Sequence, residues 1–227
     1  MVSREADLEA AKRGAADYID ELVSTLDATD LIICLSDDLQ NFRKDIYPAY
    51  KAKRRTSVRP IHLYDVKEWF GEKYDTRVYP RLEGDDVMGI LATEPHTGDR
   101  IIVSADKDMM TVPSLLYRPQ EADLGVMSIS HLDSIRFLFW QTIVGDATDG
   151  YPGCPGVGKF SVYAQDVLEA EDEIEAWDEV LMAYASKGLD ESHAVIQCNL
   201  ARILVHGAWD GKRVTPWVPP IIDEVED

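Results

Sequence analysis

Acidic residues gather in short clusters between Leu82 and Gly158, at the ends of segments whose patterns predict helices or strands. The clusters are Glu83-Gly84-Asp85-Asp86, Asp106-Lys107-Asp108, and Asp146 with Asp149, while Asp37 follows the short apolar run 31–35. In an open α/β sheet, the carboxyl ends of parallel strands meet along one edge, and ligands bind there. The fold is therefore expected to bring acids from several parts of the chain to one edge of a sheet.

Apolar residues occur at helical spacing in some segments and as short continuous runs in others. This pattern predicts helices at 6–26, 60–74, 85–92 and 132–144, and strands at 31–35, 77–79, 100–104, 115–118 and 125–129. Residues 39–55 predict a helix interrupted at Pro48. We therefore expect an α/β fold with a largely parallel central sheet flanked by helices over residues 1–130, followed by a helical region over 131–227.

The net charge of −19 argues at first against a nucleic-acid partner, which usually requires a basic surface. The positive charge is concentrated, however, because residues 43–59 carry seven basic side chains and one acid, Asp45. Phe42, Tyr47 and Tyr50 lie within or beside this segment. Aromatic faces stack on bases while Lys and Arg hold the backbone, so the segment favours DNA over a solvated loop.

The chain is long enough to bury a substantial core. It has no apolar stretch of the roughly 20 residues that cross a bilayer, so we expect no membrane partner and a cytoplasmic protein. Cys34, Cys154 and Cys198 lack the spacing of a zinc site and are expected to be reduced thiols.

The crowding of carboxylates predicts bound cations. Two like charges about 4 Å apart repel by roughly 4 kcal/mol at an effective dielectric constant near 20. Oxygen ligands favour Mg²⁺ or Mn²⁺, and two such ions can activate water and orient a phosphate. Each cluster alone has a structural explanation, since Asp85, Asp86 or Asp106 can cap a helix. Their joint occurrence, next to the glycine-rich run 153–158, favours a metal-dependent nuclease.

Five ordered motifs carry a resemblance to a known family. They are Leu35-Ser36-Asp37 with Asn41-Phe42-Arg43, Tyr50-Lys51-Ala52-Lys53-Arg54, Leu82-Glu83-Gly84-Asp85-Asp86-Val87-Met88-Gly89, Ser104-Ala105-Asp106-Lys107-Asp108, and Gly145-Asp146-Ala147-Thr148-Asp149-Gly150. The chain resembles the bacteriophage 5'-3' exonucleases of the flap endonuclease (PIN-like) superfamily. The resemblance implies the fold of these enzymes, with a basic helical arch at 39–59 and a C-terminal helix-three-turn-helix element.

The resemblance also implies a role for each matching position. The implied catalytic residues are Lys51, Arg54, Glu83, Asp85, Asp86 and Asp106. The implied metal ligands are Asp37, Glu83, Asp85, Asp86, Asp106, Asp108, Asp146 and Asp149. The expected DNA contacts are Arg43, Tyr50, Lys51, Lys53, Arg54, Arg55, Gly153, Gly156, Gly158 and Lys159. Two Mg²⁺ or Mn²⁺ ions are implied at the acidic site, with K⁺ at the glycine-rich hairpin.

One departure concerns the family's first strand, an apolar segment that ends in an aspartate and lies centrally in the sheet. Met1 leads directly into the first predicted helix, so this strand and its metal ligand are expected to be missing.

The expected reaction is hydrolysis of duplex DNA from a 5' end, with flap cleavage and hydrolysis of RNA in RNA–DNA hybrids as further activities of the family. A phage-encoded enzyme of this kind would act in the host cytoplasm. The alternative is a DNA-binding module that retains the duplex grip without turnover. A haloacid-dehalogenase-like phosphatase fits less well, because Met110 stands where its signature requires Thr or Val. A His-Asp phosphohydrolase fails because no histidine precedes an aspartate.

Overall fold

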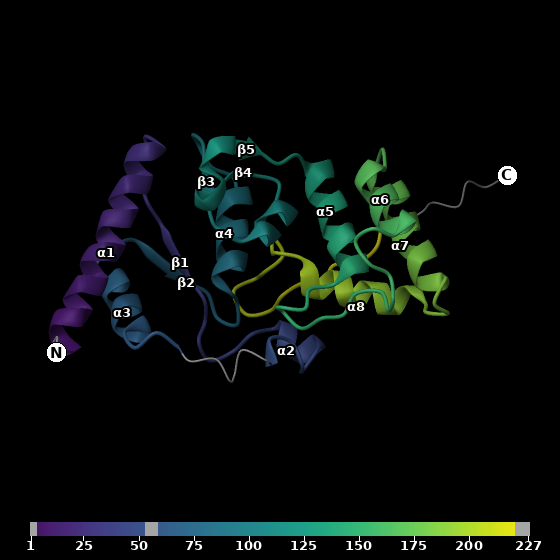
Figure 1. The fold of residues 1–227 in the computed structure, drawn as a ribbon, viewed down its shortest axis with the longest axis horizontal. Helices are drawn as coiled ribbons and strands as arrows, with labels where there is room; N and C mark the ends of the chain where they lie inside the picture. Colours follow the sequence, from purple (N-terminus) through teal and green to yellow (C-terminus); the bar gives the residue numbers. More distant parts are fainter. Residues whose placement is uncertain (1–3, 53–58, 221–227) are drawn as a thin grey trace.

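The computed structural model describes residues 4–52 and 59–220. Helices and short strands alternate through the first part of this chain, and helices dominate the rest (Figure 1). The elements are α1 (Arg4–Thr25), β1 (Ile33–Leu35), α2 (Arg43–Ile46), α3 (Leu63–Lys73), β2 (Thr76–Val78), α4 (Gly84–Thr93), β3 (Ile101–Val103), η2 (Lys107–Thr111), β4 (Leu115–Tyr117), η3 (Pro119–Leu124), β5 (Val126–Ser128), α5 (His131–Val144), α6 (Val162–Glu169), α7 (Glu173–Ala185) and α8 (Glu191–Ala201). All five predicted strands and the four predicted helices outside 39–55 are confirmed to within a few residues.

The strands form two small sheets instead of the single, largely parallel central sheet that the sequence predicted. In one sheet β1 pairs with β2 in parallel, and in the other β3 pairs in parallel with β4. β5 runs antiparallel to β4, because the short connection between them cannot make the crossover that a parallel neighbour requires. Within the described residues β1 pairs only with β2 and β3 only with β4, and α4 contacts both sheets.

The helix predicted over 39–55, with an interruption at Pro48, forms in part: the interruption is confirmed, but the helical part before it is short. Among the described residues of this segment α2 is the one α-helix, and it ends before Pro48, where Tyr47 is extended with φ −141°. The residue before a proline is driven out of the helical region by contact with the proline ring. Residues 53–58 lie outside the described part of the chain, so the predicted arch is described only up to residue 52 and from residue 59.

The largest apolar core lies among α5, α6, α7 and α8, at the end of the molecule opposite α1 (Figure 1). Phe139 packs on Trp177, with ring centroids 5.0 Å apart, and both side chains are buried. Ser130 begins α5 by accepting a hydrogen bond from the backbone N–H of Asp133, which satisfies one of the exposed donors of the first turn. No helix in residues 4–52 or 59–220 is long and apolar enough to cross a membrane.

Candidate active site

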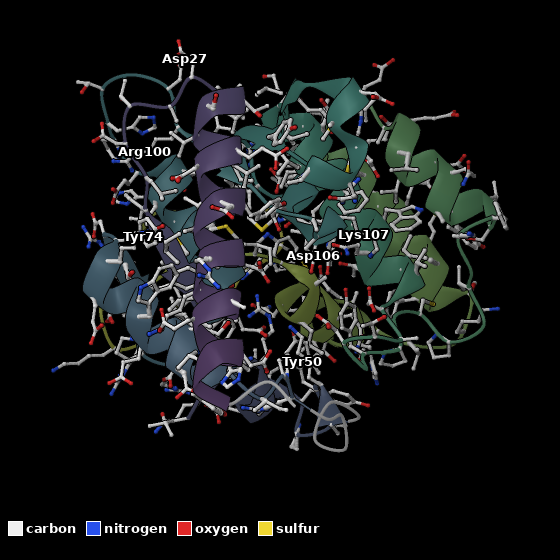
Figure 2. The ribbon with its side chains drawn as sticks, turned by 60° about the vertical axis from the view of Figure 1, so that its left-hand side comes forward. Asp27, Tyr50, Tyr74, Arg100, Asp106 and Lys107 are labelled. Atoms are coloured by element: carbon white, nitrogen blue, oxygen red, sulfur yellow. The ribbon has the colours of Figure 1, made fainter. Side chains whose placement is uncertain are left out.

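A small cavity lies where the start of α4, the turn η2, the loop after α5 and the end of α8 meet. Its volume is about 10 Å³, which is close to the space that one water molecule needs. In Figure 2, Asp106 lies near the centre of the molecule with Tyr50 below it. Five carboxylates line the cavity together with cationic, phenolic and apolar groups: Glu83, Asp85, Asp106, Asp108, Asp149, Arg43, Tyr50, Lys51, Tyr151, Leu200, Ala201 and Ile203.

The start of α4 lies directly against β1, and this contact positions the first carboxylates. Gly84 allows the approach, because a Cβ there would lie 3.0 Å from the carbonyl oxygen of Cys34. The backbone N–H of Gly84 donates to Oγ of Ser36, just past the end of β1. Glu83 and Asp86 form a capping box, in which each side chain accepts from the backbone of the other. Asp86, which was predicted both as a possible helix cap and as a site residue, thus takes part in the cap of α4.

Asp86 forms a buried ion pair with Arg43. The guanidinium donates from Nη1 to Oδ2 at 2.8 Å and from Nη2 to Oδ1 at 2.7 Å, and Asp86 is 0% exposed. Arg43 also donates to the backbone carbonyls of Leu200 at 3.1 Å and Arg202 at 2.7 Å. Two placements therefore differ from the sequence prediction: Arg43 is inside the protein, not on a DNA-binding surface, and both oxygens of Asp86 are engaged by protein donors.

Glu83 lies among three donors. Lys51 Nζ is 2.5 Å from its Oε1, while Arg43 Nη1 and the Tyr50 hydroxyl are 3.1 Å and 2.9 Å from its Oε2. Burial alone would raise the pKa of Glu83, but the charges of Arg43 and Lys51 lower it to about 2. Glu83 is therefore ionised at neutral pH and is already neutralised by the protein's own cations.

Tyr50 and Lys51 connect Glu83 to the loop after α5. The Tyr50 hydroxyl lies 3.0 Å from Oδ2 of Asp149 and 2.9 Å from Glu83, so its one proton serves one of the two carboxylates. Lys51 Nζ is 3.3 Å from the same Asp149 oxygen, and the Lys51 backbone N–H donates to the Asp149 carbonyl at 2.7 Å. Tyr50 is buried, so it is not placed to stack on a base as predicted, because its hydroxyl is drawn inward by the carboxylates.

Asp85 differs from its neighbours because its carboxylate has no hydrogen-bond or ion-pair partner in the described part of the chain. Burial, followed by the nearby charges of Asp106 and Glu83, raises the pKa of Asp85 to about 7. A raised pKa of this kind marks a place where positive charge is missing. Asp106 is exposed and accepts one hydrogen bond, from the backbone N–H of Asp108, as the predicted N-cap of η2.

Lys107 occupies the space between the last two acidic motifs, a role that the sequence did not predict. Its Nζ lies 2.9 Å from Oδ1 of Asp108 and 3.1 Å from Oδ2 of Asp146. Gln141 donates to the same Asp108 oxygen at 2.6 Å. Burial would lower the pKa of Lys107, but its contacts with Asp108 and Asp146 raise it. The sequence feature that could have indicated this role is a basic residue between two acids, in the motif Asp106-Lys107-Asp108.

Asp37 is not among the residues that line the cavity. Its oxygens accept from the backbone N–H groups of Leu39 and Arg81, each at 2.8 Å, so the side chain closes a turn after β1. Burial opposes ionisation at this position, but these backbone donors lower the pKa of Asp37. The predicted meeting of acids at one place thus occurs for Glu83, Asp85, Asp106, Asp108 and Asp149, with Asp146 joined through Lys107.

The glycine-rich run begins as a tight packing element and ends at the surface. Gly153 has φ +65°, and a Cβ there would lie 2.4 Å from the carbonyl of Ile143, so only glycine fits. Gly156 and Gly158 have open space around them, and exposed Lys159 follows. These positions remain predicted DNA contacts. The predicted contacts Lys53, Arg54 and Arg55 lie outside the described residues.

The carboxylates as arranged do not form a ready metal cage. Within residues 4–52 and 59–220, no three His, Cys, Asp or Glu side chains are grouped to hold one ion. The physical reason is that Arg43, Lys51 and Lys107 already pair with Asp86, Glu83 and Asp108. The donor set nevertheless suits a hard divalent cation, because it is made of carboxylate oxygens and includes Asp85, which has a raised pKa and no partner among the residues that the structure describes.

Comparisons with known proteins agree with one another. The model of a family described as "5'-3' exonuclease, N-terminal resolvase-like domain" matches residues 4–121. Exodeoxyribonuclease of Enterobacteria phage T3 is 29% identical over 222 residues, which cover 83% of this chain and 73% of that protein. Flap endonuclease Xni of Shewanella sp. (strain W3-18-1) is 26% identical over 168 residues, covering 69% and 64%.

Solved structures show the same fold. A mutant of phage T5 5'-exonuclease matches with a TM-score of 0.61 at 18% identity, covering 85% of this chain and 81% of that one. The T5 D15 protein co-crystallised with metal ions matches with a TM-score of 0.60 at 18% identity, covering 85% and 82%.

Proposed function

Because the chain belongs to the 5'-3' exonuclease family, we propose that it hydrolyses phosphodiester bonds of duplex DNA from a 5' end, with the help of divalent cations. The observation that carries this proposal is the cavity itself, in which five carboxylates converge and Asp85 stands without a partner among the described residues. Lys51 and Lys107 already pair with Glu83 and Asp108, but Asp85 has no such cation among the described residues, and a bound divalent ion would supply it.

Mg²⁺ or Mn²⁺ would supply Lewis-acid activation of water and stabilisation of charge on the phosphate. Asp85 and Asp106 would hold one ion, since they line the cavity and the charge of Asp106 acts on Asp85. Glu83 would join them once Lys51 moves away from its Oε1. Asp108, Asp146 and Asp149 would hold a second, once Lys107 moves away from the first two. Asp86, by contrast, acts through Arg43 to fix the start of α4, and we assign it a positioning role.

Lys51 is the cation best placed to act on a substrate phosphate. Its ammonium group lines the cavity beside Glu83, and its backbone is anchored to Asp149. A phosphate that approaches the carboxylates meets this positive charge, which stabilises the negative charge that develops during hydrolysis. Arg54 is proposed to assist from the neighbouring segment, which lies outside the described residues.

Duplex binding is proposed for the glycine-rich run, where Gly156, Gly158 and the positively charged Lys159 are exposed to solvent. Such a surface grips the phosphate backbone without reading base sequence, and a K⁺ ion is proposed to help it. One T5 flap endonuclease of similar fold was crystallised as a pseudo-enzyme-product complex with DNA and metal ions. We extend the proposed substrates to flaps and RNA–DNA hybrids.

A second candidate is a duplex-binding module without turnover. The observation that favours it is that the described residues hold no preformed group of three metal ligands. Release of nucleotides from a 5'-labelled duplex separates the two functions. We expect cleavage by the wild type in millimolar Mg²⁺ and none in EDTA.

Asp106→Ala is expected to abolish cleavage while sparing the fold, because Asp106 is exposed and carries little packing. The matched control is Asp123→Ala, at an exposed position outside the cavity lining, which should cut like the wild type. Duplex binding by the wild type with no cleavage in Mg²⁺ or Mn²⁺ would establish the binding module instead.

A further inference from the structure

Tyr151 carries a buried hydroxyl group without a partner among the described residues. The residue is 2% exposed, and its hydroxyl oxygen has no hydrogen-bond partner there. It lines the same cavity as the five carboxylates. Buried hydroxyl groups are usually satisfied, and an unsatisfied one is costly. Tyr184 shows the usual situation, since its buried hydroxyl donates to the carbonyl of Thr142 at 2.8 Å.

The loop that carries Tyr151 is held rigidly, so the hydroxyl cannot easily turn elsewhere. The backbone N–H of Asp146 donates to the Tyr151 carbonyl at 2.9 Å, and that of Tyr151 donates to the Asp146 carbonyl at 3.1 Å. Close packing of Gly145 and Gly153, where a Cβ would meet backbone atoms at 2.4 Å, holds the loop at both ends.

The size and chemistry of the cavity select its occupant. A volume of about 10 Å³ is close to what one water molecule needs and is too small for a phosphate group or a base. Carboxylate oxygens only accept hydrogen bonds, whereas the phenol can donate one. A water molecule satisfies both, because it accepts from Tyr151 and donates its two hydrogens to carboxylates of the cavity. Among these, Asp108 and Asp149 are close enough for their charges to act on Tyr151.

We propose that Tyr151 is a positioning residue, whose hydroxyl donates a hydrogen bond to one water molecule in this cavity and fixes it for phosphodiester hydrolysis. This inference rests on the proposed nuclease function. In the reaction, the oxygen of the water forms a bond to phosphorus as the P–O3' bond breaks. One of its protons ends on the 3'-hydroxyl, and the other stays with the new 5'-phosphate or passes to solvent.

The direct test is a high-resolution crystal structure of the metal-free protein. We expect an ordered water with its oxygen about 2.6–3.0 Å from Oη of Tyr151. An empty cavity, or a protein group bonded to that hydroxyl, would overturn the inference. This measurement needs no nuclease activity, so its outcome is independent of the proposed function.

The functional test compares Tyr151→Phe with Tyr184→Phe, each of which removes one buried hydroxyl. For Tyr151→Phe we expect kcat to fall about fivefold or more, with KM for duplex DNA and calorimetric Mg²⁺ affinity unchanged. Tyr184→Phe should lower the melting temperature and leave kcat per folded molecule unchanged. Unchanged kcat in Tyr151→Phe, or a loss matched by weaker Mg²⁺ binding, would contradict the positioning role. Absence of cleavage by the wild type would instead refute the proposed nuclease.

Discussion

Replacement of Asp85 by Asn tests whether the acidic cavity stores unfavourable charge. Asp85 has no partner among the described residues, and burial with the charges of Asp106 and Glu83 raises its pKa from 3.8 to about 7. A carboxyl whose pKa is higher in the folded state adds stability below its unfolded pKa, and this stability is lost as pH rises toward the folded pKa. Metal-free wild type should therefore lose stability between about pH 4 and pH 7.

The magnitude follows from the shift of about three pKa units. At about 1.4 kcal/mol per unit, ionising Asp85 in the folded protein costs at most about 4 kcal/mol at pH 8. Partial exposure screens some of this, so we expect Asp85→Asn to stabilise the metal-free protein by about 2 kcal/mol at pH 8. For a chain of this length that corresponds to a rise in melting temperature of roughly 4–8 °C. The gain should nearly disappear near pH 4, where Asp85 is protonated in the folded state and about half protonated in the unfolded state.

The assay is urea denaturation in EDTA at pH 4, 6 and 8, with Asp123→Asn as an exposed control that should show no gain. In Mg²⁺ the order should reverse, because the wild type gains stability from the bound ion and the variant loses a ligand. The variant should also be inactive. Equal stability of variant and wild type at pH 8, or a difference that does not change with pH, would refute the idea that Asp85 carries unfavourable charge in the folded protein.

Three further substitutions probe the rest of the site. Arg43→Met leaves Asp86 buried without its counter-ion and should destabilise the protein by about 3–5 kcal/mol in urea denaturation. The control Lys44→Met, at an exposed position, should have no effect. Equal stabilities of the two variants would contradict the ion pair. Lys51→Ala should lower kcat by about a hundredfold in single-turnover cleavage with little change in KM, and a change confined to KM would mean that Lys51 only binds DNA. Lys159→Ala should weaken duplex binding without affecting cleavage at saturating DNA. In fluorescence anisotropy, the slope of the logarithm of the binding constant against the logarithm of the salt concentration should become smaller in magnitude by about one. An unchanged slope would show that Lys159 does not contact the DNA backbone.

Local pattern was sufficient to locate most elements and to select the acidic residues of the cavity. Strand 31–35 and helix 132–144 were predicted correctly because the spacing of apolar residues indicates which face of an element is buried. That spacing involves only residues close together in the sequence. The acidic motifs were recognisable because carboxylates at the ends of such elements meet at one place in a fold of this type. Asp85, Asp106 and Asp108 do line one cavity.

The pairing of charges depended on contacts between residues far apart in the chain. Arg43 and Tyr50 belong to a basic, aromatic segment that resembles a DNA-binding surface, yet both are buried against Glu83 and its neighbours. The division into two small sheets also arises from packing, with α4 in contact with both.

Composition and spacing do not reveal which cation reaches which carboxylate. Only the folded chain shows that Lys107 lies between Asp108 and Asp146. The same holds for the hydroxyl of Tyr151, which has no partner among the described residues. The energy of a charge or a hydroxyl group depends on its burial and on partners within a few ångströms, and the tertiary structure alone decides both.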